Sequence, residues 1–364
     1  MEKLEKAALC FLHSINGLGN RRLWKIKVGC GSFLGFLMAD PGQLYASDFP
    51  AELVNEIIAR RKNTDLLNYL NKLEQKGIRL LCIEDSDYPE MLKNIPNPPY
   101  ILYLKGELNI NAQCRIAVVG SRKATVYGKK TAFRIGKELA VHGMEVVSGM
   151  ARGIDTQAHL GALDAGGGTI AVLGSGLNNI YPRENYKLYE RICESGLVMS
   201  EFSLDTRPEP GNFPNRNRLI SGLCRGVVVV EAKVKSGALI TADFALEQGR
   251  DVFAVPGPID SEYSEGTNNL IKQGAQLITG ADDILQEYNY TNKIPFGGVK
   301  QEELHFLDAN ESLVVAYLNH QPFHFDEIFS ATGLDIGELG TLLLKLELAG
   351  IVKSLPGNYY VKIN

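Results

Sequence analysis

The feature that most constrains the fold is a series of seven short apolar segments between residues 115 and 280. Most of these segments end at a glycine, and segments of helical periodicity separate them. Strands that are apolar throughout and feed into helices are typical of a parallel sheet with helices on both faces. We therefore predict an α/β protein with a doubly wound, mostly parallel, Rossmann-like sheet. The predicted strands are 115–120, 144–149, 169–174, 196–201, 226–232, 251–257 and 275–280.

Different patterns flank this region. Residues 1–76 have apolar residues at helical spacing, and Gly77 follows as a helix stop. The predicted sheet domain covers residues 77–290, and the polar stretch 291–303 reads as a linker. Residues 304–364 contain three helical segments and then two short strands around a Pro-Gly turn, which is the order of a winged-helix domain.

Composition and charge exclude several classes of protein. The 364-residue chain has a net charge of −4, so it is not a globally basic nucleic-acid binder. No uncharged apolar run approaches the roughly 18 residues that a membrane span needs. Its six cysteines form no CxxC pair, which argues against a zinc site or a disulfide framework and favours the cytoplasm.

The two ends of the chain differ in charge. Residues 1–30 hold six basic against two acidic residues, and 301–364 hold three lysines against nine acidic residues, so we expect the C-terminal segment to repel a polyanion. The stretch "LHSINGLGNRRLWKI" at 12–26 matches a helix-hairpin-helix, whose Gly-x-Gly turn can approach a nucleic-acid phosphate. The same pattern also occurs as a plain helical turn.

Basic residues follow successive predicted strands. In parallel α/β sheets, ligands bind beyond the carboxyl ends of the strands. Arginines and lysines gathered at that edge favour a phosphate-rich ligand, which would also explain the unusual stretch "RNR" at 216–218. Alternatively, Arg216 and Arg218 could pair with Glu209 or Glu231. The candidate binding residues are Gly120, Ser121, Arg122, Arg152, Arg183, Arg216, Asn217, Arg218, Lys233, Ser236 and Gly237.

Catalytic and cofactor motifs find little support. The segment "KATVYGKKT" lacks the first glycine and the Ser/Thr of a P-loop, and "GSGLNN" lacks the last glycine of a dinucleotide fingerprint. No GxSxG motif occurs. Asp155 and His159 stand four apart on a predicted helix, but without a third ligand we interpret them as a helix start and a packed histidine. We expect no metal, no cofactor and no catalytic residue.

Several longer segments, taken in order, resemble the DprA/Smf family of bacterial DNA-processing proteins of natural transformation. The likeness spans nearly the whole chain and is strongest over 115–290. It rests on "VVGSRKATVYG", "VVSGMARGIDTQAHLGAL", "IAVLGSGLNNIYPREN", "NFPNRNRLISGL", "VVVEAKVKSGALITADFALEQGRDVFAVPG" and "GTNNLIKQGA". Their order and spacing are more specific than any single glycine motif.

The resemblance implies a non-catalytic protein that binds single-stranded DNA, protects incoming strands during competence and helps to load the recombinase RecA, working as a homodimer. It implies that the Gly120-Ser121-Arg122 turn binds DNA, together with Arg183, where many relatives have lysine. The arginines of "RNR" and Lys233 fall in matching motifs. Tyr181, Phe213 and Phe202 are stacking candidates for the bases, although Phe202 better fits the core.

Two other functions remain open. One is a nucleoside-monophosphate-processing enzyme of a related Rossmann-like fold, which would cleave the glycosidic bond. Those enzymes carry a PGGxGTxxE motif, whereas the matching region here reads "EAKVKSGALITADFALEQG". The other is a protein-interaction scaffold whose basic rim binds an acidic protein. We expect the acidic winged-helix domain to have a structural or protein-binding role.

Overall fold

The computed structural model describes residues 1–110, 114–290, 309–318, 321–348 and 351–362. The chain divides into two compact units, Met1–Phe296 and Gly297–Asn364, and each is described by itself. The predicted linker 291–303 lies outside the described residues. Among the described residues, no helix has both the length and the apolar character that crossing a bilayer requires.

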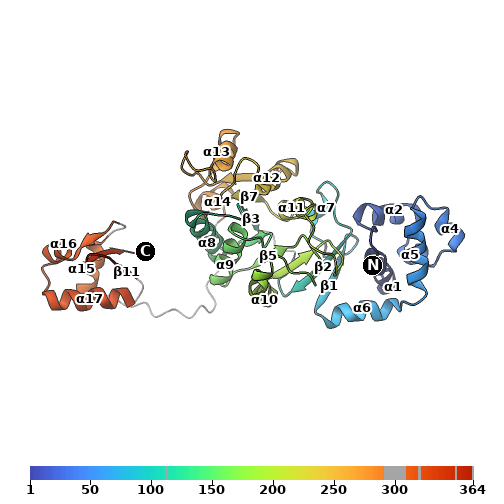
Figure 1. Ribbon diagram of the computed structural model, residues 1–364, viewed down its shortest axis with the longest axis horizontal. Helices are drawn as coiled ribbons and strands as arrows, with labels where there is room; N and C mark the ends of the chain where they lie inside the picture. The colour runs from blue at the N-terminus through green and yellow to red at the C-terminus, as the bar shows by residue number, and fades with distance from the viewer. Residues whose placement is uncertain (111–113, 291–308, 319–320, 349–350, 363–364) are drawn as a thin grey trace. The chain divides into compact units, whose positions relative to one another are not determined.

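The first unit is built on a nine-stranded sheet, coloured cyan to orange in Figure 1, and all seven predicted strands belong to it. The strand order is β1-β2-β6-β5-β4-β3-β7-β8-β9, and the seven strands β3 to β9 run parallel to one another. The prediction of a mostly parallel α/β sheet is therefore confirmed. The parallel strands are β3 (Arg115–Val119), β4 (Glu145–Ser148), β5 (Thr169–Val172), β6 (Leu197–Ser200), β7 (Gly226–Val229), β8 (Asp251–Ala254) and β9 (Gln276–Leu277).

Two further strands extend one edge of the sheet. Strands β1 (Ile78–Cys82) and β2 (Ile101–Gly106) pair with each other in antiparallel register, and β2 pairs antiparallel with β6. The short helix α7 (Glu90–Lys93) lies between them in the sequence. One face of this edge is buried because residues of the N-terminal helices pack against Ile78, Leu80, Ile101 and Tyr103 in one apolar cluster.

The order of the strands reverses at β3. The chain adds β4, β5 and β6 on one side of β3 and then crosses to place β7, β8 and β9 on the other side. In an open α/β sheet, a crevice for a ligand forms at such a switch point, outside the carboxyl ends of the strands. Residues Gly120 to Arg122 follow β3 and residues 230 to 237 follow β7, so both segments border this crevice.

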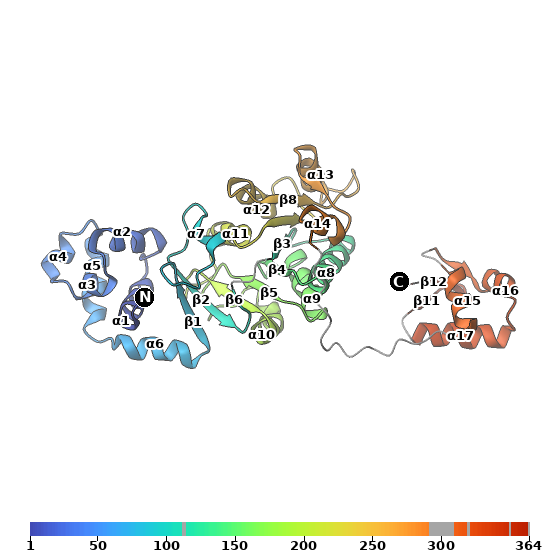
Figure 2. The same ribbon diagram turned by 180° about the vertical axis from the view of Figure 1, so that it is seen from behind.

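Helices cover both faces of the sheet, as Figures 1 and 2 show. Alternate residues of β3 point to opposite faces, so Ile116 and Val118 pack in one apolar cluster and Ala117 and Val119 in another. The first cluster takes its helical residues from α8 (Val126–Val141), α9 (Ile154–Asp164) and α14 (Ala281–Glu287). The second takes them mainly from α7, α11 (Asn212–Gly222), α12 (Gly237–Glu247) and α13 (Glu265–Lys272). Helix α10 (Tyr186–Ser195) follows the short 3₁₀ helix η1 (Arg183–Asn185) and packs on β6.

The N-terminal helices share an apolar core with the end of the sheet. They are α1 (Lys3–His13), α2 (Asn20–Cys30), α3 (Phe33–Met38), α4 (Pro41–Tyr45), α5 (Ala51–Arg61) and α6 (Leu66–Gln75). Helices α1 and α2 are joined by the predicted glycine turn, in which Gly17 has a φ of 91°. At the junction with the sheet, His13 Nδ1 lies 3.0 Å from the hydroxyl of Tyr103 in β2. Nucleic-acid contact by this turn stays a prediction.

The second unit has the predicted winged-helix order. Its elements are α15 (Ala309–Tyr317), β10 (Phe323–His324), α16 (Phe325–Thr332), α17 (Ile336–Leu348), β11 (Val352–Leu355) and β12 (Tyr359–Lys362). The strands form a small antiparallel sheet in the order β10-β12-β11. Val314, Ile328, Leu342 and Val352 form part of its own apolar core, so this unit has the packing of an independent domain.

Candidate functional site

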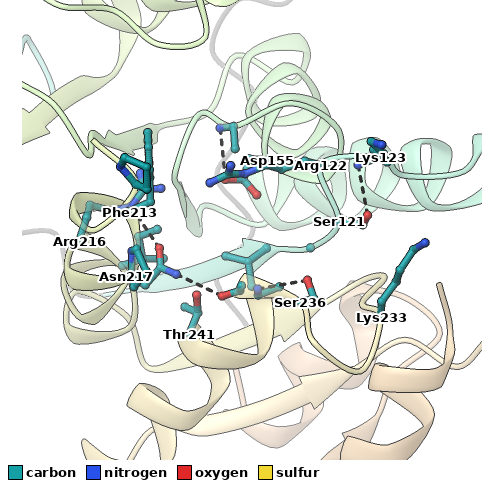
Figure 3. Close-up of a pocket in the computed structure, with 18 of the residues that line it drawn as sticks. Ser121, Arg122, Lys123, Asp155, Phe213, Arg216, Asn217, Lys233, Ser236 and Thr241 are labelled. Carbon is teal, nitrogen blue, oxygen red and sulfur yellow. Dashed lines mark hydrogen bonds between the residues drawn. The ribbon is translucent and has the colours of Figure 1, made fainter. Parts of the chain in front are cut away.

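A pocket of about 710 Å³ lies at the switch point of the sheet. Its walls come from the segments after β3, β4 and β7 and from helix α11 (Figure 3). In Figure 3, Phe213, Arg216 and Asn217 stand on one side, and Ser121, Lys123 and Lys233 on the other. Eight predicted site residues line it: Gly120, Ser121, Arg122, Arg216, Asn217, Lys233, Ser236 and Gly237. Arg152, Arg183 and Arg218 do not.

The Gly120-Ser121-Arg122 turn is fixed by Glu231. The amide of Ser121 donates to the Glu231 carbonyl (2.8 Å), and the amide of Thr125 donates to the Glu231 carboxylate (2.9 Å). Gly120 packs so closely that a Cβ atom there would lie 2.6 Å from Ile154. The Glu231 carboxylate also accepts from the Thr125 hydroxyl, so it lies at the N-terminal end of α8.

Arg122 and two aromatic rings form an exposed surface at the mouth of the pocket. The guanidinium of Arg122 lies 5.1 Å from the ring centroid of Phe213, and the rings of Phe213 and Tyr181 are 5.5 Å apart at their centroids. Lys123 and Lys235 line the same pocket. A basic rim beside partly exposed rings suits a chain that carries both phosphates and bases.

Arg216 is a buried part of the pocket floor, with 3% of the residue exposed. Its guanidinium donates to the carbonyls of Gly149 (2.9 Å) and Val172, at the carboxyl ends of β4 and β5, and Nε donates to Asn217 (3.2 Å). Burial lowers the pKa of Arg216 to about 10, so the side chain remains charged at neutral pH. A Cβ on Gly149 would lie 2.4 Å from this guanidinium, which explains the glycine.

Arg218 points to a different part of the core. It forms an ion pair with Glu201, just beyond β6, and neither side chain is more than 9% exposed. The partners considered from the sequence, Glu209 and Glu231, are not used: Glu231 binds the Thr125 backbone instead. Arg218 therefore meets its negative charge inside the protein.

Arg152 and Lys233 are exposed, and each is held by a carboxylate. Arg152 forms a two-pronged ion pair with Glu184, with 2.7 Å between Nη2 and Oε2. Lys233 forms an ion pair with Glu262 and lies 4.6 Å from the ring centroid of Tyr263. Arg183 is exposed in η1, next to Glu184.

The side chains of Asp155 and His159 are both buried and hydrogen-bonded within the protein. Asp155 lines the pocket, and its carboxylate accepts from the amides of Gly149 (3.1 Å) and Ala151 (3.3 Å). Burial raises the pKa of Asp155, and Arg216 opposes that shift. His159 is fully buried, with Nδ1 2.7 Å from the hydroxyl of Thr169. Within the described residues, no group of three His, Cys, Asp or Glu side chains could hold a metal ion.

Comparison with protein families gives two matches to this chain. Residues 79–289 match the family model described as DNA recombination-mediator protein A, and residues 301–358 match the DprA winged helix domain. The first match alone covers more than half of the chain. The protein belongs to the DprA/Smf family. This confirms the resemblance predicted from the motifs and the winged-helix interpretation of the C-terminal unit.

Other members of the DprA/Smf family are similar over most of their length. The chain is 36% identical over 346 residues to Protein Smf of Synechocystis, covering 86% of this chain and 87% of that one. It is similar to the X-ray structure of DNA processing protein A from Streptococcus pneumoniae, with a TM-score of 0.66 and 37% identity over 79% of this chain and 98% of that one. It is also similar to a structure of DNA processing protein A from Helicobacter pylori, described by its single-stranded DNA binding mode. The TM-score is 0.53 and the sequence identity is 31%, over 58% of this chain and 98% of that one.

The structure adds residues to the site that the sequence prediction did not include. Lys123, Lys235 and Thr241 line the pocket. Lys123 follows the Gly120-Ser121-Arg122 turn directly, and Lys235 lies between two predicted site residues, so adjacency in sequence was the available signal. Thr241 gave no such signal, because its place depends on α12 packing beside α11.

Proposed function

We propose that this DprA/Smf protein binds single-stranded DNA in the switch-point pocket, without catalysing a reaction on it. The backbone of the strand lies along Arg122, Lys123 and Lys235, and bases stack against Phe213 and Tyr181. The observation that carries the proposal is the contact of Arg122 with Phe213, because it places a cation that can bind a phosphate beside a ring on which a base can stack. The Helicobacter pylori relative, titled for single-stranded DNA binding, supports the same ligand.

The non-catalytic part of the proposal is supported by Asp155. It is the one carboxylate among the described residues that line the pocket, and backbone amides and the charge of Arg216 engage it. A carboxylate held in this way anchors the segment after β4. Release of free base from a nucleoside monophosphate by the purified protein would contradict this part.

We further propose that the protein works in the cytoplasm as a homodimer, protects incoming strands during natural transformation and helps to load RecA onto them. The support is membership of the DprA/Smf family. Sedimentation velocity tests the dimer. Recombinase filament growth on single strands, measured with and without this protein, tests loading; no acceleration at any protein ratio would contradict it.

The test of DNA binding is fluorescence anisotropy with a labelled oligonucleotide at several salt concentrations. We expect Arg122→Ala to weaken binding and to flatten the log–log salt slope by about 0.7, because one phosphate contact is lost. We expect Arg183→Ala to weaken binding of the same oligonucleotide as well. Duplex DNA of the same sequence should bind less tightly than the single strand.

The matched control is Arg191→Ala, which removes the same charge from the exposed surface of α10, outside the pocket. We expect its affinity and salt slope to equal those of the unmodified protein. Equal losses in Arg122→Ala and Arg191→Ala would show a diffuse charge effect and no specific pocket. No single-strand binding at physiological salt would favour a protein-interaction scaffold.

A further inference from the structure

Two basic residues at the predicted DNA-binding rim are already neutralised by carboxylates of the same unit. Lys233, after β7, is paired with Glu262, and Arg152, after β4, is paired with Glu184. By contrast, no ion pair involves Arg122, Lys123 or Lys235 within the part of the chain that the structure describes. The rim therefore combines three open cations, meaning basic residues without a carboxylate partner among the described residues, with two that are already paired.

We propose that Glu184 and Glu262 limit the affinity of this protein for single-stranded DNA, because a phosphate must displace each of them to reach Arg152 or Lys233. The inference rests on the proposed function. Glu184 and Glu262 thereby set which part of the rim a strand engages first: the open cations Arg122, Lys123 and Lys235.

The two ion pairs are built differently but have the same consequence. Glu184 offers both carboxylate oxygens to Nε and Nη2 of Arg152, which is the geometry in which arginine also grips a phosphate. Lys233 is held by Glu262 and by the ring of Tyr263, the next residue along the chain. Phosphate and carboxylate therefore compete for the same donor atoms.

Glu184 and Lys233 both keep their charge at neutral pH. The hydrogen bonds that Arg152 donates lower the pKa of Glu184, and the hydrogen bond that Lys233 donates to Glu262 raises the pKa of Lys233. All four side chains are between 44% and 61% exposed, so solvent screens the pairs and a polyanion can displace them.

The experiment compares the single-strand affinities of the full-length protein with Glu184→Gln and Glu262→Gln, using the same labelled oligonucleotide. Glutamine keeps the shape of glutamate and removes its charge. We expect each variant to bind about two- to fivefold more tightly, the effect typical of breaking one exposed ion pair. Glu190→Gln on α10 and Glu265→Gln at the start of α13 remove the same charge from exposed positions and serve as controls.

Double variants separate a local effect from a change in total charge. If Glu262 acts through Lys233, Glu262→Gln should tighten binding in the unmodified protein and have no effect in Lys233→Ala. Arg152→Ala should abolish the gain from Glu184→Gln in the same way. Unchanged or weaker binding in both glutamine variants, or gains equal to those of the two controls, would overturn the inference while leaving DNA binding intact. Absence of binding by the unmodified protein would instead overturn the proposed function, and this inference with it.

Discussion

Replacing Arg216 tests whether this arginine is primarily part of the fold. In Arg216→Met, the carbonyls of Gly149 and Val172 lose their buried donor, and Asp155 loses the positive charge near its buried carboxylate. Each orphaned acceptor costs about 1–3 kcal/mol. Removing one partner of a buried charge pair lowers the free energy of unfolding by about 3–5 kcal/mol in total. We therefore expect the free energy of unfolding to fall by about 3–5 kcal/mol.

Urea unfolding followed by the fluorescence of Trp24 measures this loss, because the single tryptophan packs against Tyr100 in the unit that contains Arg216. The matched control is Arg122→Met, at an exposed arginine of the same pocket, where we expect a change within about 0.5 kcal/mol. The slope of the unfolding free energy against urea should stay constant. A loss below about 1 kcal/mol in Arg216→Met would refute the reasoning and make Arg216 a residue held for its ligand.

Three further predictions follow from the same structure. Gly128→Ala should destabilise the protein and weaken DNA binding, because a Cβ there would lie 2.3 Å from the Glu231 carboxylate that fixes the predicted phosphate-binding turn; equal urea midpoints and affinities would contradict this. Burial lowers the pKa of His159 to about 3, so as the pH falls the unfolded chain takes up this proton before the folded protein does. The free energy of unfolding should therefore fall as the pH drops below about 6.5, with a loss of about 2.7 kcal/mol at pH 4.5. Urea unfolding at a series of pH values measures this loss, and His159→Asn should flatten the pH dependence. Deleting residues 301–364 should leave anisotropy-measured DNA affinity nearly unchanged, since this acidic segment belongs to a separate unit; a large loss would show that it contacts DNA.

The sheet could be predicted from the sequence because parallel strands buried on both faces have to be apolar throughout. β3 and β7 carry that signal in nearly every residue. Strands β1 and β2 were not predicted as strands, although each is largely buried. Their antiparallel pairing at the sheet edge is set by contact with β6 and with the N-terminal helices, which are distant in sequence.

The site could be predicted only in part, because sequence shows which cations follow a strand but not what each one faces. Arg122, Arg152, Arg216 and Arg218 are equivalent in that respect. In the structure, one is open, one holds Glu184 and two are buried. A carboxylate that neutralises an arginine comes from another segment of the chain, so its effect is visible only once the fold brings the two together.

The stretch "RNR" now has a physical explanation. In an α-helix, residues two apart point in nearly opposite directions, so Arg216 and Arg218 would not share one ligand. Each arginine meets a different partner at the carboxyl ends of the strands. Arg216 donates to carbonyls at the ends of β4 and β5, and Arg218 pairs with the carboxylate of Glu201 just beyond β6. Asn217, between them, donates to the carbonyl of Gly237 at the start of α12 (3.2 Å).

This division of roles changes how the pocket attracts an anion. Arg216 is charged, buried and in the pocket floor, so solvent ions screen it much less than the exposed cations around it. In the proposed complex, its charge would therefore act on a bound phosphate even though backbone carbonyls take its hydrogen bonds. In the proposed complex, Arg122, Lys123 and Lys235 would supply the displaceable, salt-sensitive contacts, while Arg216 would supply a fixed field beneath them. It follows that a part of the attraction for DNA should persist at salt concentrations that abolish the contribution of the exposed rim.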